Sequence, residues 1–141
     1  MNEDTGARVH RSFWVISGIA LVWNVLGCAN FVVQLDPDTH AAYRDVERAI
    51  IEGRPMWATA GFAIAVFGGA IGSLLLLLRK SPAVRFLVAS LLGVFVAMRH
   101  TVTVDVGFGT GEIIGIVVMP LAVAMFLVWY GRFARRKGWI R

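Results

Sequence analysis

Charged side chains and cysteine are both scarce in this sequence of 141 residues. Asp, Glu, Lys and Arg together make up only 16% of the chain, whereas soluble domains carry about 25%, so an ordinary water-soluble domain is excluded. Hydrophobic residues account for 57%, and this excess requires contact with lipid. Cys28 is the single cysteine, which excludes an intramolecular disulfide, a CxxC redox pair and a thiolate metal site.

The few charged residues divide the chain into apolar runs, which cover residues 12–35, 55–78, 86–98 and 113–131. These runs contain 24, 24, 13 and 19 residues. A helix needs about 20 residues to cross a hydrocarbon layer about 30 Å thick, so only the third run is too short. None of the runs alternates apolar with polar residues, as transmembrane β-strands do. The sequence therefore predicts an all-α polytopic membrane protein.

The short third run requires a longer helix than its apolar residues alone would form. Ser81 and Pro82 provide a helix start, and the helix must continue through Arg99 to about Val104 in order to cross the membrane. We therefore expect a single membrane domain over residues 1–141, a four-helix bundle with spans at about 12–35, 55–78, 83–104 and 112–131.

Basic residues predict the orientation of the bundle. With four spans, both termini and the loop between the second and third spans share one side, which carries 10 of the 14 Lys and Arg residues, while the opposite side carries 7 of the 9 acids. The positive-inside rule then places both termini in the cytoplasm. Because the basic residues flank spans, we expect the lipid bilayer and not nucleic acid as their partner. Trp139 and Ile140 are expected to enter the membrane interface.

The connection between the first two spans is long and partly helical. Tyr43, Val46 and Ile50 recur at helical spacing, and Gly53 and Pro55 mark the end of the periodic segment. We expect a short amphipathic helix on the outer surface.

The first span also allows a processing alternative. Residues 25–28 resemble a lipoprotein cleavage box that ends at Cys28, after the basic residues Arg8 and Arg11. Against this, Leu26 is too bulky for such a box, and the apolar run continues past Cys28.

Asn24 places an amide at the middle of the first span. It lies on a face of small or polar residues, so this face is expected to contact protein and not lipid. Two interpretations stay open: Asn24 bonds a neighbouring helix, or it contacts a solute or a partner chain. Close helix packing is predicted at small residues on three spans, namely Gly27, Gly61, Ala65, Gly68, Gly69, Gly72 and Gly93.

Arg99 falls inside the predicted third span, where a charge needs a partner. We expect an outer polar cluster in which Arg99 and His100 meet Asp105 and Glu112. The alternative is an interfacial arginine bound to a lipid phosphate.

Chemistry-bearing residues are otherwise few. No acid lies centrally in a span, and His10 and His40 fall outside the membrane, so neither a proton-coupled exchanger of the small multidrug type nor haem ligation between spans is favoured. No pair of carboxylates or Ser/His/Asp set can be placed together. We expect no enzymatic activity, no catalytic residues, no cofactor and no metal site.

Two long segments carry a resemblance to a known family. These segments, residues 13–27 and 54–80, include Leu21-Val22-Trp23-Asn24-Val25-Leu26-Gly27 and Arg54-Pro55-Met56-Trp57-Ala58-Thr59-Ala60-Gly61. The chain resembles an uncharacterised family of small bacterial four-span membrane proteins, often labelled automatically as sugar transporters. The Pro-Gln pairs of small sugar-exporting bundles are absent, so these residues do not support that label. The resemblance implies a bacterial inner-membrane protein with a four-helix bundle.

Two function classes remain. The first is a structural or accessory membrane protein that packs with its own copies, as a homo-oligomer, or with a larger membrane partner. The second is a minimal oligomeric transporter or channel for a small solute.

Overall fold

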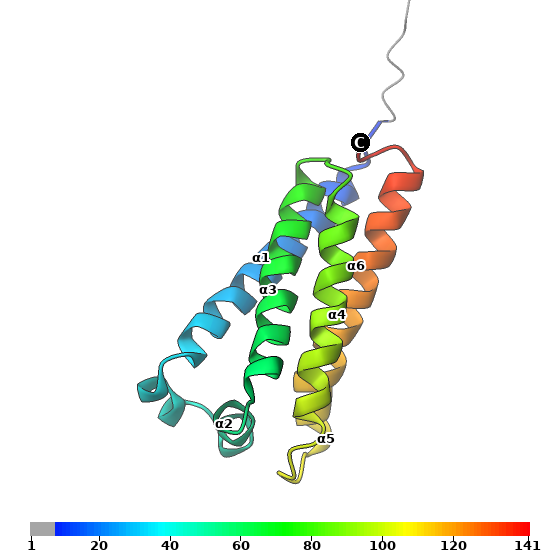
Figure 1. Ribbon diagram of the computed structural model, residues 1–141. Coiled ribbons are helices and arrows are strands. Elements are labelled where there is room, and N and C mark those ends of the chain that lie inside the picture. The colour runs from blue at the N-terminus through cyan, green and yellow to red at the C-terminus, as the bar shows by residue number, and fades with distance from the viewer. Residues whose placement is uncertain (1–7) are drawn as a thin grey trace, which may run out of the picture.

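A computed structural model describes residues 8–141 and contains four long helices that lie side by side (Figure 1). These are α1 (Arg11–Gln34), α3 (Met56–Leu77), α4 (Ala83–Thr101) and α6 (Met119–Arg136). All four are long and apolar enough to cross a membrane, the fourth counted over Thr110–Arg136. The prediction of an all-α bundle with four membrane-spanning helices is confirmed.

Shorter helical elements connect the spans. A 3₁₀ helix, η1 (Pro37–Ala42), and the helix α2 (Asp45–Glu52) lie between α1 and α3. Ile50 and Ile51 of α2 are buried, whereas Asp45 and Glu52 are exposed, so this helix is amphipathic as expected. Before α6 come α5 (Thr110–Glu112) and the π-helical segment η2 (Ile113–Val118).

The third span is shorter, and the fourth longer, than their sequence patterns indicate. Helix α4 ends at Thr101 and not at Val104, because Val102 and Thr103 bond carbonyls of the last turn and close it. The fourth span begins at Thr110 and continues to Arg136. The basic residues after position 131 extend the helix and do not end it.

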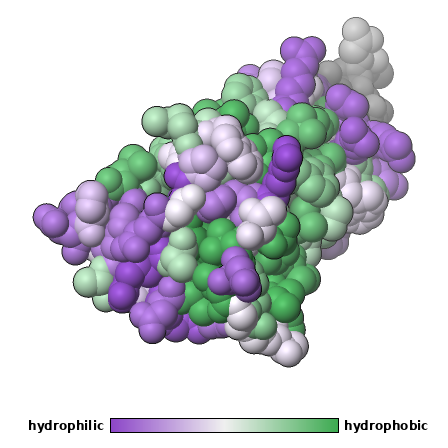
Figure 2. Space-filling model, turned by 60° about the horizontal axis from the view of Figure 1, so that its bottom comes forward, coloured by the Kyte–Doolittle hydropathy of each residue, from purple (hydrophilic) through white to green (hydrophobic). Residues whose placement is uncertain are grey.

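The four long helices pack in the order α1, α3, α4, α6. Helices α3 and α4 share the most extensive contact, α1 packs on α3, and α6 packs on α4. We call the end that holds the C-terminus and the α3–α4 turn the termini end, and the opposite end the α2 end. Figure 1 shows that α1 leans away from α6 toward the α2 end. Figure 2 shows hydrophilic surface gathered mainly at two ends of the molecule, with hydrophobic surface between them.

A compact apolar core closes the termini end. Its buried members come from all four long helices and from the C-terminal tail: Phe13, Leu76, Ala83, Val84, Tyr130, Ala134 and Ile140. The rings of Phe13 and Tyr130 stack with centroids 6.3 Å apart and so join α1 to α6 at this end.

The C-terminal tail folds onto the bundle. Ser81 N donates to Arg141 O at 2.8 Å, and Arg79 Nε donates to Trp139 O at 2.7 Å, which ties the tail to the α3–α4 turn. Ile140 is only 3% exposed, and Trp139 packs edge-on against Phe13. Ile140 therefore belongs to the protein core, contrary to the expectation that it enters the membrane interface, whereas Trp139 is only partly buried against that core.

Candidate functional site

A cleft of about 470 Å³, which we call the α1–α6 cleft, occupies the half of the bundle nearest the α2 end. Its walls come from α1 and from η2 and α6, its floor from α3 and α4, and α2 contributes to its rim. Small-molecule sites have volumes of about 300–1,000 Å³, so the cleft has the size of a ligand site. Most of its lining is apolar, and its polar members are Asn24, Asn30, Gln34, Tyr43, Glu47, Arg54, Ser90 and Thr101.

At the deep end of the cleft, Asn24 bonds its own helix and α3. Asn24 Nδ2 donates to Ala20 O at 2.8 Å and to Ser73 Oγ at 3.3 Å. Close by, Ser90 Oγ of α4 donates to Ala65 O of α3 at 2.6 Å. Asn24 is 8% exposed, and no hydrogen bond from residues 8–141 reaches its Oδ1. The side chain thus joins two helices and also lines the cleft.

Glycines allow the helices to approach closely around Asn24. A Cβ on Gly69 would collide with Asn24 Oδ1, and one on Gly93 would lie 2.6 Å from Gly61 O. Gly61 faces Val96, Gly72 faces Leu87, and Gly27 faces Val66 in the same way, with 3.0 Å or less available for an added methyl. Gly68 and Ala65 also face α4. The small-residue stripes therefore pack inside the bundle.

At the rim of the cleft, Arg54 is a cation without an acidic partner among residues 8–141. The residue precedes Pro55 at the start of α3 and is only partly exposed, and its guanidinium carbon lies 4.9 Å from the centroid of the Phe62 ring. Burial lowers the pKa of Arg54, and the neighbouring Tyr43 opposes part of this shift. Of the acids on the rim, Glu47 already pairs with Arg44 at 3.3 Å. An anion at this position would find an unpaired guanidinium.

The other polar groups of the rim include one bonded pair and one group without a partner among residues 8–141. Tyr43 Oη donates to Asn30 Oδ1 at 2.8 Å, which joins the segment after η1 to α1. Gln34 Oε1 is buried and accepts no hydrogen bond from the described residues. These groups add hydrogen-bonding capacity beside Arg54.

The wall of the cleft that η2 and α6 form is irregular. Gly115 and Ile116 of η2 and Pro120 of α6 line it. In a regular α-helix the ring of Pro120 would clash with the carbonyl of Ile116, and the π-helical turns of η2 lie in this segment. Such turns are frequent at functional sites.

Within residues 8–141, the two basic members of the predicted outer cluster contact the same ring, and neither forms an ion pair with the two acids. The Arg99 guanidinium is exposed and lies 5.8 Å from the Trp57 ring centroid. His100 is buried, packs edge-on against Trp57, and its Nε2 lies 3.2 Å from Ile50 O of α2. Arg99 and His100 therefore share Trp57 as a neighbour, although successive helical residues are about 100° apart around the axis.

Neither acid of that cluster pairs with Arg99 within the described residues. Glu112 pairs with Arg44 at 3.6 Å and accepts a hydrogen bond from Gly109 N at 2.9 Å. Asp105 is exposed, and no ion pair within residues 8–141 includes either Asp105 or Arg99. Trp57, not a carboxylate, is the contact of Arg99.

Sequence reasoning did not identify Arg54 as a site residue. Its position directly before Pro55 indicated only the boundary of a span. The sole available signal was that Arg54 precedes an apolar run with no acid beside it, and sequence distance could not show that Glu47 is already paired.

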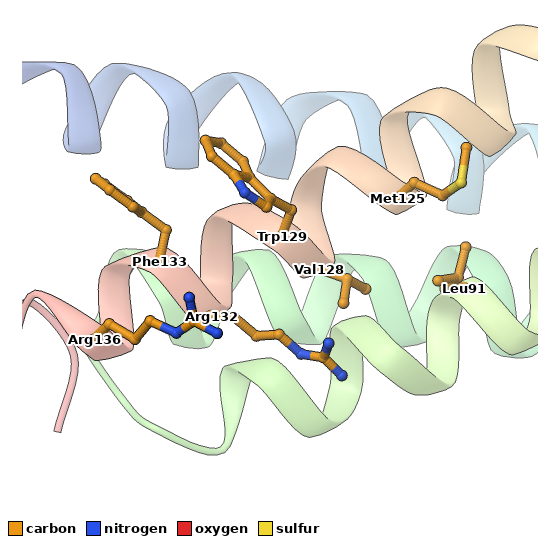
Figure 3. A pocket seen from close by; sticks show the side chains of 7 residues that line it. All are labelled: Leu91, Met125, Val128, Trp129, Arg132, Phe133 and Arg136. Carbon is orange, nitrogen blue, oxygen red and sulfur yellow. The ribbon is translucent and has the colours of Figure 1, made fainter.

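A second, smaller concavity lies on α4 and α6 nearer the termini end (Figure 3). Its volume is about 300 Å³, and its lining combines aliphatic, aromatic and basic side chains: Leu91, Met125, Val128, Trp129, Arg132, Phe133 and Arg136. We call it the α4–α6 groove.

No cluster of three or more His, Cys, Asp or Glu residues that could hold a metal ion occurs within residues 8–141. No family model, curated protein or solved structure matches the chain. The four candidate spans identify a small polytopic membrane protein.

Proposed function

We propose that this protein is a minimal transporter-type membrane protein that admits a small organic acid with an apolar body into the α1–α6 cleft. Of the two function classes that the sequence left open, this is the second. One observation carries it: a single cleft connects the unpaired Arg54 at its rim with Asn24 at its deep end. A bacterial inner membrane with the termini in the cytoplasm belongs to the proposal and rests on the distribution of basic residues.

The charge of the ligand follows from Arg54. The Arg54 guanidinium is partly buried over Phe62 and has therefore lost part of its hydration. No carboxylate of the described residues pairs with it to offset this loss. A carboxylate, sulfonate or phosphate would form charge-assisted hydrogen bonds with it, and Arg suits such planar or branched anions.

The apolar body of the ligand follows from the lining below the rim. Phe62, Val94, Ala124 and Leu127 line the cleft between Arg54 and its deep end. A ligand with an acidic group at one end would lay its apolar part on these side chains, and its far end would reach Asn24 and Ser90.

The closed termini end accounts for a one-sided opening. The stacked rings of Phe13 and Tyr130 and the buried Leu76 lie between the cleft and that end. In this arrangement the cleft is closed toward the termini end. Release on the other side would require α1 and α6 to separate at the Phe13–Tyr130 contact.

Ligand binding is tested with a fluorescent naphthalenesulfonate, which is permanently anionic and has an apolar body. The matched control ligand is the neutral sulfonamide, and the matched control variant is Arg99→Gln, which removes an exposed charge at the α2 end from a side chain that does not line the cleft and forms no ion pair within residues 8–141. We expect the sulfonate to bind the wild-type protein in nanodiscs better than the sulfonamide. Arg54→Gln should lose about tenfold in affinity for the sulfonate, the equivalent of one charge-assisted bond, while Arg99→Gln should retain it.

Transport is tested by uptake of the same sulfonate into proteoliposomes. Uptake that exceeds the leak of protein-free vesicles and falls in Arg54→Gln supports the proposal. Binding without uptake removes the transporter part, and equal affinity of wild type and Arg54→Gln contradicts the proposal as a whole.

One observation favours the accessory class as the second candidate. Helix α6 meets α1 mainly at the termini end, so a helix of a second copy or of a larger partner would find an apolar space beside α1 and α6 at the α2 end. A Cys28→Ser, Ala124→Cys variant distinguishes the two. In cells, a charged thiol reagent should reach Cys at position 124 if the cleft is open, and a bound helix should block the reaction until the protein is purified away from its partner.

A further inference from the structure

The α4–α6 groove is separate from the cleft of the proposed function and contains an arrangement of charge that the proposed function does not use. Arg132 and Arg136 are four residues apart on α6 and therefore lie on one face of the helix. Figure 3 shows both arginines on the same side of α6, next to the ribbon of α4. Like charges at this spacing destabilise an isolated helix by about 0.2–0.5 kcal/mol.

No acid within residues 8–141 offsets this repulsion. None of the ion pairs or side-chain hydrogen bonds of the described residues involves Arg132 or Arg136, and both side chains are exposed. An anion that bridged the two guanidinium groups would convert the repulsion into two charge-assisted contacts.

The groove changes from basic to apolar along its length. Arg136 is the last residue of α6, and Arg132 lies one turn deeper in the bundle. Further along, Val128 and Met125 of α6 and Leu91 of α4 complete the lining. Met125 lies seven residues before Arg132, a distance of about 10 Å along a helix. In Figure 3 Arg136 lies toward one end of the view, Met125 and Leu91 lie toward the other, and Arg132 lies between them.

This order matches the chemistry of a phospholipid and not that of a soluble anion or an acidic peptide. The apolar part of the groove lies on the membrane-spanning helices α4 and α6. At this depth the surroundings are lipid acyl chains, and a hydrated peptide is excluded. Trp129 also lines the groove, three residues before Arg132 on α6, and its amphipathic ring suits the level of the lipid headgroups. Arginine also binds phosphate oxygens in a bidentate manner.

We propose that the α4–α6 groove is a binding site for an anionic phospholipid of the leaflet at the termini end. The phosphodiester bridges Arg132 and Arg136, and one acyl chain lies along Val128, Met125 and Leu91. Basic pockets between transmembrane helices are known to take lipid headgroups in this manner. The site uses no residue of the α1–α6 cleft, so it stands or falls independently of the proposed function.

The experiment is a titration of the delipidated full-length protein, followed by native mass spectrometry. The probes are phosphatidylglycerol, the zwitterionic phosphatidylcholine, and water-soluble glycerophosphate as a source of the phosphate group alone. The key variant is Arg132→Gln, Arg136→Gln. Its matched control is Arg135→Gln, Lys137→Gln, which removes the same charge at the same helix end from exposed side chains that do not line the groove.

We expect wild type and control to bind phosphatidylglycerol better than phosphatidylcholine and glycerophosphate. The key variant should lose phosphatidylglycerol affinity by about tenfold or more, as expected from two arginines that each attract an anionic lipid. A second variant, Met125→Trp, should weaken phosphatidylglycerol binding without any change of charge, because the larger ring fills the path of the acyl chain.

Three outcomes would overturn the site. Equal losses in the key variant and its control would show only general attraction between a basic helix end and acidic lipid. Full competition by glycerophosphate, with Met125→Trp unaffected, would assign the arginines to a headgroup-sized anion or to an acidic peptide. Unchanged binding in the key variant would remove the arginines from the site.

Discussion

Asn24 on α1 donates a hydrogen bond from Nδ2 to Ser73 Oγ on α3, with the two atoms 3.3 Å apart near the middle of the bundle. Water does not compete for this hydrogen bond in a membrane interior. The bond is therefore one of the few polar links that hold α1 to α3. The same amide lines the deep end of the cleft, so its structural and binding roles meet in one side chain.

A double-mutant cycle on Asn24→Ala and Ser73→Ala should measure this link. We expect a coupling energy of about 0.6 kcal/mol, the average for hydrogen bonds between membrane helices. Unfolding of the purified variants in bicelles with added SDS provides the free energies. A coupling near zero would mean that Asn24 bonds Ala20 alone and leaves α1 and α3 unlinked at this depth.

Gly69→Ala tests the close approach of the helices around Asn24. The added methyl would collide with Asn24 Oδ1 and approach Ser90 Oγ to 3.1 Å, so we expect a loss of about 1–3 kcal/mol in stability. Gly18→Ala on α1 is the matched control, because its methyl meets no atom within 4 Å. The control should be neutral or slightly stabilising, since alanine is the better helix former. Similar losses in both variants would contradict the packing described.

The pairing of the charges at the α2 end is tested by two further cycles. Arg44 with Glu112 should show a coupling of about 0.2–1 kcal/mol, the usual value for an exposed ion pair. Arg99 with Asp105 should show none, because the Arg99 guanidinium lies on the Trp57 ring. Thermal unfolding at low and high salt provides the measurement. A salt-sensitive coupling between Arg99 and Asp105 would restore the cluster expected from the sequence.

Ile140→Ala tests the docking of the C-terminal tail. Ile140 is buried with Phe13 and Leu76, so the truncation should cost about 2 kcal/mol or more in unfolding free energy. Leu78→Ala is the control at the same end, because Leu78 is exposed and should contribute less than about 0.5 kcal/mol. A tail that lies in the lipid interface would instead make the two variants equivalent.

Much of the architecture was predictable because hydrocarbon imposes a length on every span. The boundaries of α1 and α3 lie within a residue or two of the expected apolar runs. The reason is that charged residues flank each run at its two ends, where the helix reaches the membrane surface. The end of α4 differed, because hydrogen bonds of Val102 and Thr103 to the last turn close the helix at Thr101. Local capping of this kind leaves little trace in an apolar pattern.

The polar contacts were harder to predict than the helices. The sequence placed Arg99 near Asp105 and Glu112 along the chain, but the structure brings Trp57 to Arg99 and Arg44 to Glu112 from the other half of the protein. Sequence spacing reports neighbours on one helix, whereas these partners come from different elements. Arg54 and the groove of Arg132 and Arg136 escaped notice for the same reason.

The sequence by itself determined that this chain forms four apolar helices, since backbone groups in lipid must bond within a helix and about 20 residues are needed to cross the layer. It also predicted close helix packing at the glycines and left two roles open for Asn24. Only the tertiary structure decided that those glycines serve contacts inside the bundle, and that the Phe13–Tyr130 contact joins α1 to α6 at one end while the helices diverge at the other. The contact between α1 and α6 depends on side chains that are far apart in the sequence. The cleft exists because the two helices touch at one end and diverge at the other.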